Sequence, residues 1–199
     1  KDVEYVIDNI SITVVGEYKD PTAVTPGDGT DPEFIEDFND YEDASSKKGS
    51  SFGTPTFALT DEGVDGSKAL VVGGRVESYF GYSFDVAKFI GNTISVKADV
   101  KPVGTEDAVD LKASIKLSAE GKEDAYQQIG IIQATSDTFT SIDGTYEIPA
   151  DLSGATVYFE APKDVEYVID NISITVVGEY KDPNGGSEGG YVDTSGYPV

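Results

Sequence analysis

Hydrophobic and polar residues alternate along several short stretches of the chain, which is the pattern of a β-strand with one buried face. The clearest stretch predicts an apolar face formed by Ile94, Val96, Ala98 and Val100. The odd-numbered residues from 111 to 117 form a second such face. No stretch of the sequence shows a sustained helical period. The pattern therefore predicts strands separated by turns rich in Gly, Pro and Asp.

Applied to the whole chain, this pattern predicts about nine or ten short strands. The first lies within 33–43, where it leads into an acidic turn, and another, over 76–86, is broken at Gly81. The others are predicted over 52–60, 68–72, 94–100, 111–117, 126–132, 139–148, 155–160 and 167–177. Short strands joined by turns are typical of an all-β fold with two packed sheets, a β-sandwich.

One block of sequence, KDVEYVIDNISITVVGEYKDP, occurs twice without a change, at 1–21 and at 163–183. Its β-branched and aromatic run predicts a buried strand, and one sandwich has room for one such terminal strand. The second copy follows the strand at 155–160 through a short turn, whereas the first would have to return across 22–32. Closing the longer loop costs slightly more. We expect the second copy to complete the domain and the first to be free or captured by a neighbouring chain as an exchanged strand.

The composition of the flanking segments predicts the domain organisation. We interpret 1–21 as a duplicate of the terminal strand, either the tail of a preceding repeat or an engineered addition. Residues 22–32 and 181–199 are rich in Pro, Gly, Thr and Ser and are predicted to be linkers, the latter towards a following domain. Residues 33–180 are predicted to form the sandwich.

Charge and composition exclude several classes of function. With 14 basic and 37 acidic residues, the chain of 199 residues has a net charge of −23, which disfavours nucleic acids and anionic membranes as partners. It contains neither cysteine nor histidine, so disulfides and the commonest catalytic base are absent. Paired carboxylates can hydrolyse glycosides, but no pair is marked out in this sequence. We therefore expect a binding protein and not an enzyme.

Four motifs occur in an order that resembles a known family. They are GSKALVVGGRVESYFGYSFDV (66–86), DAYQQIGI (124–131), IDGTYEIPADLSGATVYFEAP (142–162) and YVIDNISI (167–174). Together they resemble the family 22 carbohydrate-binding modules, the xylan-binding jelly rolls attached to family 10 xylanases. Families 4 and 9 are less similar. The resemblance implies a calcium-stabilised β-jelly roll with a shallow cleft for xylan, in a bacterial protein that is secreted or displayed on the cell surface.

The alternation also predicts which side chains could bind a sugar, a ligand that needs aromatic rings for its C–H faces and polar groups for its hydroxyls. Three strands each place a tyrosine on a polar face, and the pairs are Tyr79 with Arg75, Tyr126 with Gln128, and Tyr158 with Glu160. The alternative is an ordinary solvated sheet face. The resemblance places Tyr126, Tyr158 and Glu160 in the cleft.

The same resemblance also marks two departures from the family. Tyr79 stands where the family commonly has a stacking tryptophan, and no arginine occurs near Ser51, so Arg75 and Lys48 are the candidates to replace it. Both departures predict weaker or altered sugar binding.

The resemblance further implies one calcium site, where the first-strand turn meets the last strand. The predicted ligands are Asn39, Asp40 and Asp170, with Asn171 or Glu36 in reserve. The alternative is a capped turn beside a solvated aspartate.

From the sequence, we predict a non-catalytic module that binds xylan and targets an attached xylanase. A calcium-stabilised structural or adhesive repeat is the alternative.

Overall fold

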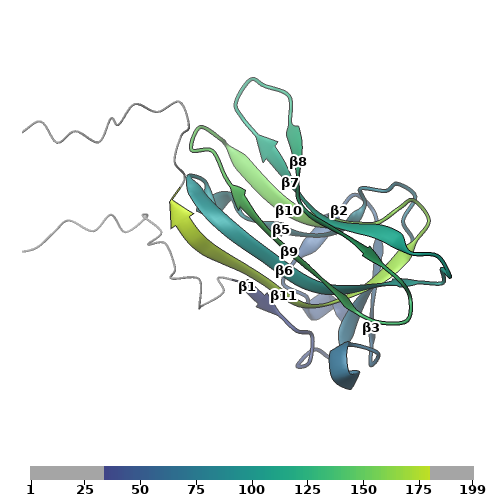
Figure 1. Ribbon diagram of the computed structural model, residues 1–199. Coiled ribbons are helices and arrows are strands. Elements are labelled where there is room, and N and C mark those ends of the chain that lie inside the picture. The colour runs from purple at the N-terminus through teal and green to yellow at the C-terminus, as the bar shows by residue number, and fades with distance from the viewer. Residues whose placement is uncertain (1–33, 180–199) are drawn as a thin grey trace, which may run out of the picture.

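Eleven strands form two antiparallel sheets that pack face to face in the computed structural model (Figure 1). The structure describes residues 34–179, so the predictions for 1–21, 22–32 and 181–199 lie outside the described residues. The all-β sandwich predicted from the alternation is confirmed, with its strands arranged as a jelly roll. Within residues 34–179, no helix has the length and apolar character needed to cross a membrane.

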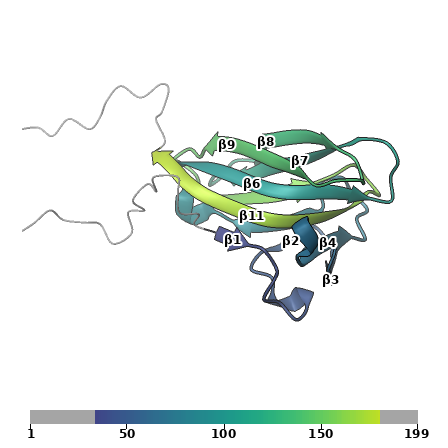
Figure 2. The ribbon, with the colours of Figure 1, turned by 60° about the horizontal axis from the view of Figure 1, so that its bottom comes forward.

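The first sheet has six strands in the order β3-β4-β11-β6-β9, and β1 pairs with β11. The bounds of these strands are β1 Phe34–Glu36, β3 Thr56–Thr60, β4 Ala69–Gly73, β6 Asn92–Val103, β9 Thr140–Glu147 and β11 Glu166–Glu179. In Figure 2 the strands of the six-stranded sheet lie one below another, from β9 through β6 and β11 to β4 and β3.

The second sheet has five strands in the order β2-β5-β10-β7-β8. They are β2 Ser50–Phe52, β5 Gly81–Asp85, β7 Val109–Ser118, β8 Ala125–Ala134 and β10 Gly154–Glu160. Three short 3-10 helices, Ala44–Ser46, Val64–Gly66 and Ala87–Phe89, lie in the connections.

The core lies between the sheets and follows the predicted alternation. The four apolar residues predicted for β6 are all buried, as are the odd-numbered residues of β7 from Leu111 to Leu117. Aromatic residues from other strands, among them Phe84, Phe159 and Tyr167, fill the space between these two faces. Burying such side chains supplies most of the free energy that opposes chain entropy.

The second copy of the repeated block forms β11, as predicted. On one side β11 pairs with β6 along most of its length, and on the other side it pairs with β4 at Tyr167–Ile169 and with β1 at Ile172–Ile174. It is therefore an interior strand, and its side chains Ile169, Ile172 and Ile174 are buried in the core. β11 thus joins β4 and β1 to β6 in this sheet.

Two predicted strands are shorter than the sequence pattern suggested. The strand predicted over 52–60 is divided because Gly53 adopts a φ of 77°, which ends β2, and β3 begins only at Thr56. The strand predicted over 76–86 is confined to β5, since the residues before Gly81 form a loop around the side chain of Arg75.

Candidate functional site

The outer face of the five-stranded sheet carries most of the predicted site residues. In β10, the side chains of Val157 and Phe159 belong to the core, so Tyr158 and Glu160 face outward. Their register partners on β7 are Ser114 and Lys112. One strand further on, Gln128 pairs with Ser114 and Tyr126 with Lys116, which places Tyr126 and Gln128 on this same face.

An irregularity in β8 is what gives Tyr126 this orientation. Ala113 pairs with Gly130, but the next residue of β7, Ser114, pairs with Gln128, so Ile129 is an extra residue in the ladder. An extra residue exchanges the two faces of a strand beyond it. With regular pairing, Tyr126 would lie opposite the core residue Leu117 instead of Lys116. The bulge therefore directs Tyr126 and Gln128 towards the outer face.

Four aromatic side chains, Phe52, Tyr79, Tyr126 and Tyr158, line an open pocket of about 350 Å3 on this face. Tyr126 and Tyr79 are 54% and 46% exposed, whereas Tyr158 is only 3% exposed. The ring of Phe52 stacks on the ring of Tyr158 with centroids 4.1 Å apart and planes inclined by 7°. Phe52 thus covers Tyr158, and the rings left accessible to a ligand are those of Tyr79, Tyr126 and Phe52.

Polar groups continue the pocket along β7 and β10. A second hollow of about 170 Å3 shares Tyr126 and Tyr158 with the aromatic pocket and is also lined by Lys112, Ser114, Gln127, Gln128 and Glu160. The Ser114 hydroxyl donates to Glu160 Oε1 at 2.5 Å, and Ser114 is buried although it does not belong to the core face of odd-numbered residues in β7. Burial raises the pKa of Tyr158 to about 12, so its hydroxyl stays protonated and can donate a hydrogen bond.

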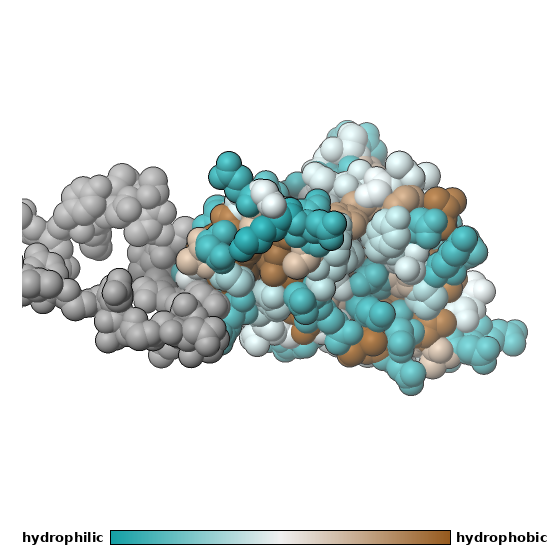
Figure 3. All heavy atoms as spheres, turned by 90° about the horizontal axis from the view of Figure 1, so that it is seen from above, coloured by the Kyte–Doolittle hydropathy of each residue, from teal (hydrophilic) through white to brown (hydrophobic). Residues whose placement is uncertain are grey.

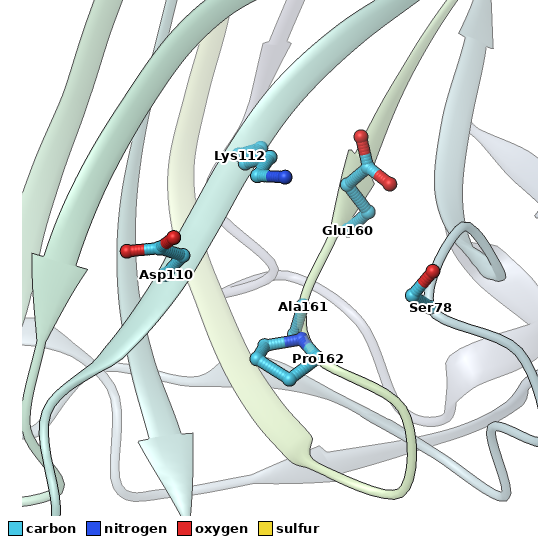
Figure 4. Close-up of a pocket in the computed structure, with 6 residues that line it drawn as sticks. All are labelled: Ser78, Asp110, Lys112, Glu160, Ala161 and Pro162. Carbon is cyan, nitrogen blue, oxygen red and sulfur yellow. The ribbon is translucent and has the colours of Figure 1, made fainter.

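A third hollow of about 130 Å3 lies beyond Glu160 (Figure 4). We call it the charged pocket, and it is lined by Ser78, Asp110, Lys112, Glu160, Ala161 and Pro162. It shares Lys112 and Glu160 with the polar hollow. The three hollows therefore adjoin one another on one sheet face, and we call them together the cleft, which is aromatic at one end and charged at the other.

The structure corrects the assignment of Arg75, which was predicted to share an outer strand face with Tyr79. Arg75 is 4% exposed, and its guanidinium donates to five main-chain carbonyl oxygens. These acceptors belong to Ser78, Phe80, Ala161, Pro162 and Val165. With its donors occupied and its side chain buried, Arg75 cannot contact a ligand in the cleft. Lys48, the other candidate, donates its ammonium to the Ile35 carbonyl at the first sheet.

The cleft thus brings together five of the six predicted sugar-binding residues, Tyr79, Tyr126, Gln128, Tyr158 and Glu160. Sequence reasoning missed the other lining residues, chiefly Phe52, Ser78, Asp110 and Lys112. For Lys112 a signal existed, because it alternates with core residues of β7. Phe52 and Ser78 gave none, since β2 is too short to show a period and Ser78 lies in a loop.

Two of the predicted calcium ligands, Asp170 and Asn39, already accept hydrogen bonds from the protein. Asp170 is fully buried and already accepts three hydrogen bonds, from the Val64 amide at 3.0 Å, the Ser67 hydroxyl at 2.7 Å and the Asn171 amide at 2.8 Å. The Asn39 side-chain oxygen accepts from the Lys68 amide at 3.1 Å, and Asp40 is exposed.

Acidic side chains do not gather around these residues. No group of three or more Asp and Glu residues that could hold an ion occurs within 34–179. Asp170 already accepts three of the roughly four hydrogen bonds that a carboxylate can take, which leaves little capacity for an ion. Calcium at this place stays a prediction.

A melting experiment tests this site. Since Asp170 is satisfied by protein donors, we expect the same Tm in a chelator as in millimolar calcium. A ligand of the folded state raises Tm by mass action. A clearly lower Tm in the chelator would establish the calcium site that the sequence predicts.

Comparison with known proteins identifies the fold. No protein-family model matches the sequence, and no curated protein matches it. Among solved structures, the chain is similar to the CBM22-1 xylan-binding domain of Paenibacillus barcinonensis Xyn10C, with 20% identity and a TM-score of 0.68 over 78% of this chain and 99% of that one. The jelly roll is therefore of the kind found in family 22 carbohydrate-binding modules.

Two further structures agree. The C-terminal family 22 module of Clostridium thermocellum Xyn10B has 16% identity and a TM-score of 0.67, over 78% of this chain and 100% of that one. The CBM22-1-GH10 modules of the endo-1,4-beta-D-xylanase 10B from the same organism, complexed with xylohexaose, have 18% identity and a TM-score of 0.63, over 73% of this chain and 28% of that one. Identities this low show a shared fold and nothing more.

Proposed function

We propose that this chain is a non-catalytic carbohydrate-binding module that holds a xylan chain in the cleft. The observation that carries the proposal is the juxtaposition of exposed aromatic rings with hydrogen-bonding side chains in adjoining hollows on one sheet face. Aromatic surface alone would suit many apolar ligands. The neighbouring carboxylate and amide groups favour a ligand that has both apolar faces and many hydroxyls.

Each part of the cleft has a distinct role in this proposal. Tyr126 and Tyr79 stack on the C–H faces of successive sugar rings. Gln128 and Glu160 bond the hydroxyls at the ring edges, since a carboxylate accepts and an amide both donates and accepts. Phe52 and Tyr158 form a two-ring wall that limits how far the sugar can shift across the sheet.

The choice of xylan is supported by the similarity in fold to a domain described as xylan-binding and to a module structure complexed with xylohexaose. The same proposal includes an attached xylanase and a location outside a bacterial cell. Both are supported by similarity in fold, since one similar structure joins such a module to a GH10 module.

Affinity electrophoresis in gels that contain soluble neutral xylan tests the proposal. We expect the chain to be retarded and to release no reducing ends. Release of sugars would indicate a glycoside hydrolase, for which the cleft contains the carboxylates of Asp110 and Glu160. If the chain is not retarded and releases no sugars, the result would favour a structural or adhesive repeat. The duplicated block supports that interpretation.

The first mutation to measure is Tyr126→Ala. Because this ring is the most exposed aromatic of the cleft, its truncation should weaken xylan binding by about 1–3 kcal/mol, the usual range for an anchoring aromatic. Isothermal titration with a xylo-oligosaccharide measures the change in affinity.

The matched control is Ile35→Ala, which removes a 51% exposed apolar side chain from β1 in the other sheet. This variant should bind xylan as the parent does. Parent-like binding by Tyr126→Ala would show that the sugar lies elsewhere.

A further inference from the structure

The charged pocket contains a lysine and a glutamate that face each other without forming an ion pair. Lys112 and Glu160 are register partners on β7 and β10, a placement in which opposite charges commonly pair. Within residues 34–179, the ion pairs are Lys97–Asp143, Lys116–Asp124 and Lys122–Asp151, and Lys112 is in none of them. Figure 4 shows the amine of Lys112 directed towards the Glu160 side of the pocket, with open space between them.

Both side chains keep hydrogen-bonding capacity for a ligand. Glu160 uses Oε1 to accept the Ser114 hydroxyl, which leaves Oε2 for a further donor. The ammonium of Lys112 has three donors. A hydroxyl can accept from the lysine and donate to the glutamate at the same time, whereas a carboxylate or an ammonium on the ligand can satisfy only one of the two.

The size and charge of the pocket further limit the class of ligand that it can bind. Its volume is about 130 Å3, against about 350 Å3 for the aromatic pocket, so it is the smaller hollow and suits the edge of one sugar ring. Asp110, on the same strand as Lys112, adds a second carboxylate. Two carboxylates beside one ammonium leave a negative pocket in a chain whose net charge is −23.

We propose that the charged pocket is a selectivity site, in which a hydroxyl of an uncharged sugar unit accepts a hydrogen bond from Lys112 and donates one to Glu160. Asp110 disfavours chains that carry uronic-acid branches. The inference rests on the proposed function, because it concerns the charged end of the same cleft. It adds Ser78, Asp110 and Lys112 to the binding residues and gives the module a preference for neutral polysaccharide.

Two ligands and two variants test the hydroxyl bridge. Lys112→Met keeps the apolar stem and removes the ammonium, so binding of a neutral linear xylo-hexasaccharide should weaken about tenfold, as expected for loss of a hydrogen bond from a charged group. Lys97→Met removes an equal charge from β6 in the other sheet, where Lys97 forms an exposed ion pair with Asp143. It should change this affinity less than threefold.

The second arm tests the selectivity of Asp110. The ratio of affinities for the neutral oligosaccharide and for a xylo-oligosaccharide with glucuronic-acid branches is measured at low salt. Asp110→Asn should shift this ratio about threefold towards the acidic ligand. Glu147→Gln removes an equal charge from an exposed site on β9, in the other sheet, and should leave the ratio unchanged. Salt screens distant charges, so 0.5 M NaCl should reduce the parent's preference.

The outcomes separate this inference from the proposed function. Parent-like binding of the neutral ligand by Lys112→Met would overturn the bridge. An equal shift in Asp110→Asn and Glu147→Gln would mean that net charge alone sets the preference, which overturns the role of Asp110. In both cases the loss of binding in Tyr126→Ala still supports the proposed function. If the parent binds neither ligand, the proposed function and this inference fail together.

Discussion

Replacement of Arg75 by methionine is expected to destabilise the domain by about 3–5 kcal/mol, because several buried carbonyls lose their donor at about 1–3 kcal/mol for each group left unsatisfied. The guanidinium donates hydrogen bonds to five main-chain carbonyls. Its Nη2 atom lies 2.5 Å from the Ser78 oxygen and 2.7 Å from the Ala161 oxygen. Methionine fills similar space but leaves these carbonyls without that donor. Equilibrium unfolding in urea measures the change in the free energy of unfolding.

Two further variants test whether the carbonyl contacts of Arg75 cause this loss of stability. Arg75→Lys keeps the charge but cannot reach five acceptors, so it should recover only part of the stability. Lys97→Met removes a cation from an exposed ion pair with Asp143 and should change the free energy of unfolding by less than about 1 kcal/mol. If Arg75→Met loses no more than Lys97→Met, the carbonyl contacts of Arg75 do not contribute to stability.

A single methyl group at Gly81 should have a comparable effect. A Cβ atom built at Gly81 would lie 1.7 Å from the main-chain oxygen of Phe159. The two residues belong to the neighbouring strands β5 and β10, so only a shift of the backbone can relieve the clash. We expect Gly81→Ala to lower the free energy of unfolding by about 3–5 kcal/mol, at or above the upper end for overpacking.

Gly154→Ala is the matched control, because it makes the same substitution in β10 at a position with space. There the nearest atom to the added methyl is Ser118 Cβ at 3.6 Å, an ordinary contact. Its stability should stay within about 1 kcal/mol of the parent and could increase, since alanine restricts the unfolded chain. A Gly81→Ala protein as stable as Gly154→Ala would show that β5 and β10 are not packed this closely.

The parts of the fold that the sequence predicts are those in which burial alone decides the structure. In β6 and β7, every second residue is apolar because one face meets the core, and the pattern is visible without knowing the partner strand. The loop before Gly81 is different. Its shape depends on bonds from Arg75 to carbonyls as distant as Val165, and a carbonyl has no sequence signature. The strand predicted there was therefore too long.

The same distinction applies to the cleft. Tyr126 and Gln128 share a face because they are two residues apart, and this much the sequence shows. Which face they share depends on the bulge at Ile129, and no residue type marks a bulge of this kind. Phe52 contributes through its stack on Tyr158, a partner more than 100 positions away. Pairings of that range require the assembled sheet.

The position of Arg75 also bears on how the domain distinguishes two segments that are chemically identical. Of the five carbonyls that the guanidinium binds, only that of Val165 lies in the repeated block, while Ala161 and Pro162 lie directly before it. A segment with the sequence of residues 1–21 could reproduce every pairing of β11 in 163–179. Only the strand continuous with β10 anchors the turn that carries the Ala161 and Pro162 carbonyls at both of its ends. If the two hydrogen bonds to this turn require both anchors, then at roughly 0.5–1.5 kcal/mol for each bond the arginine favours the continuous strand by about five- to 150-fold. A recognition element outside the duplicated sequence thus keeps strand choice within the domain.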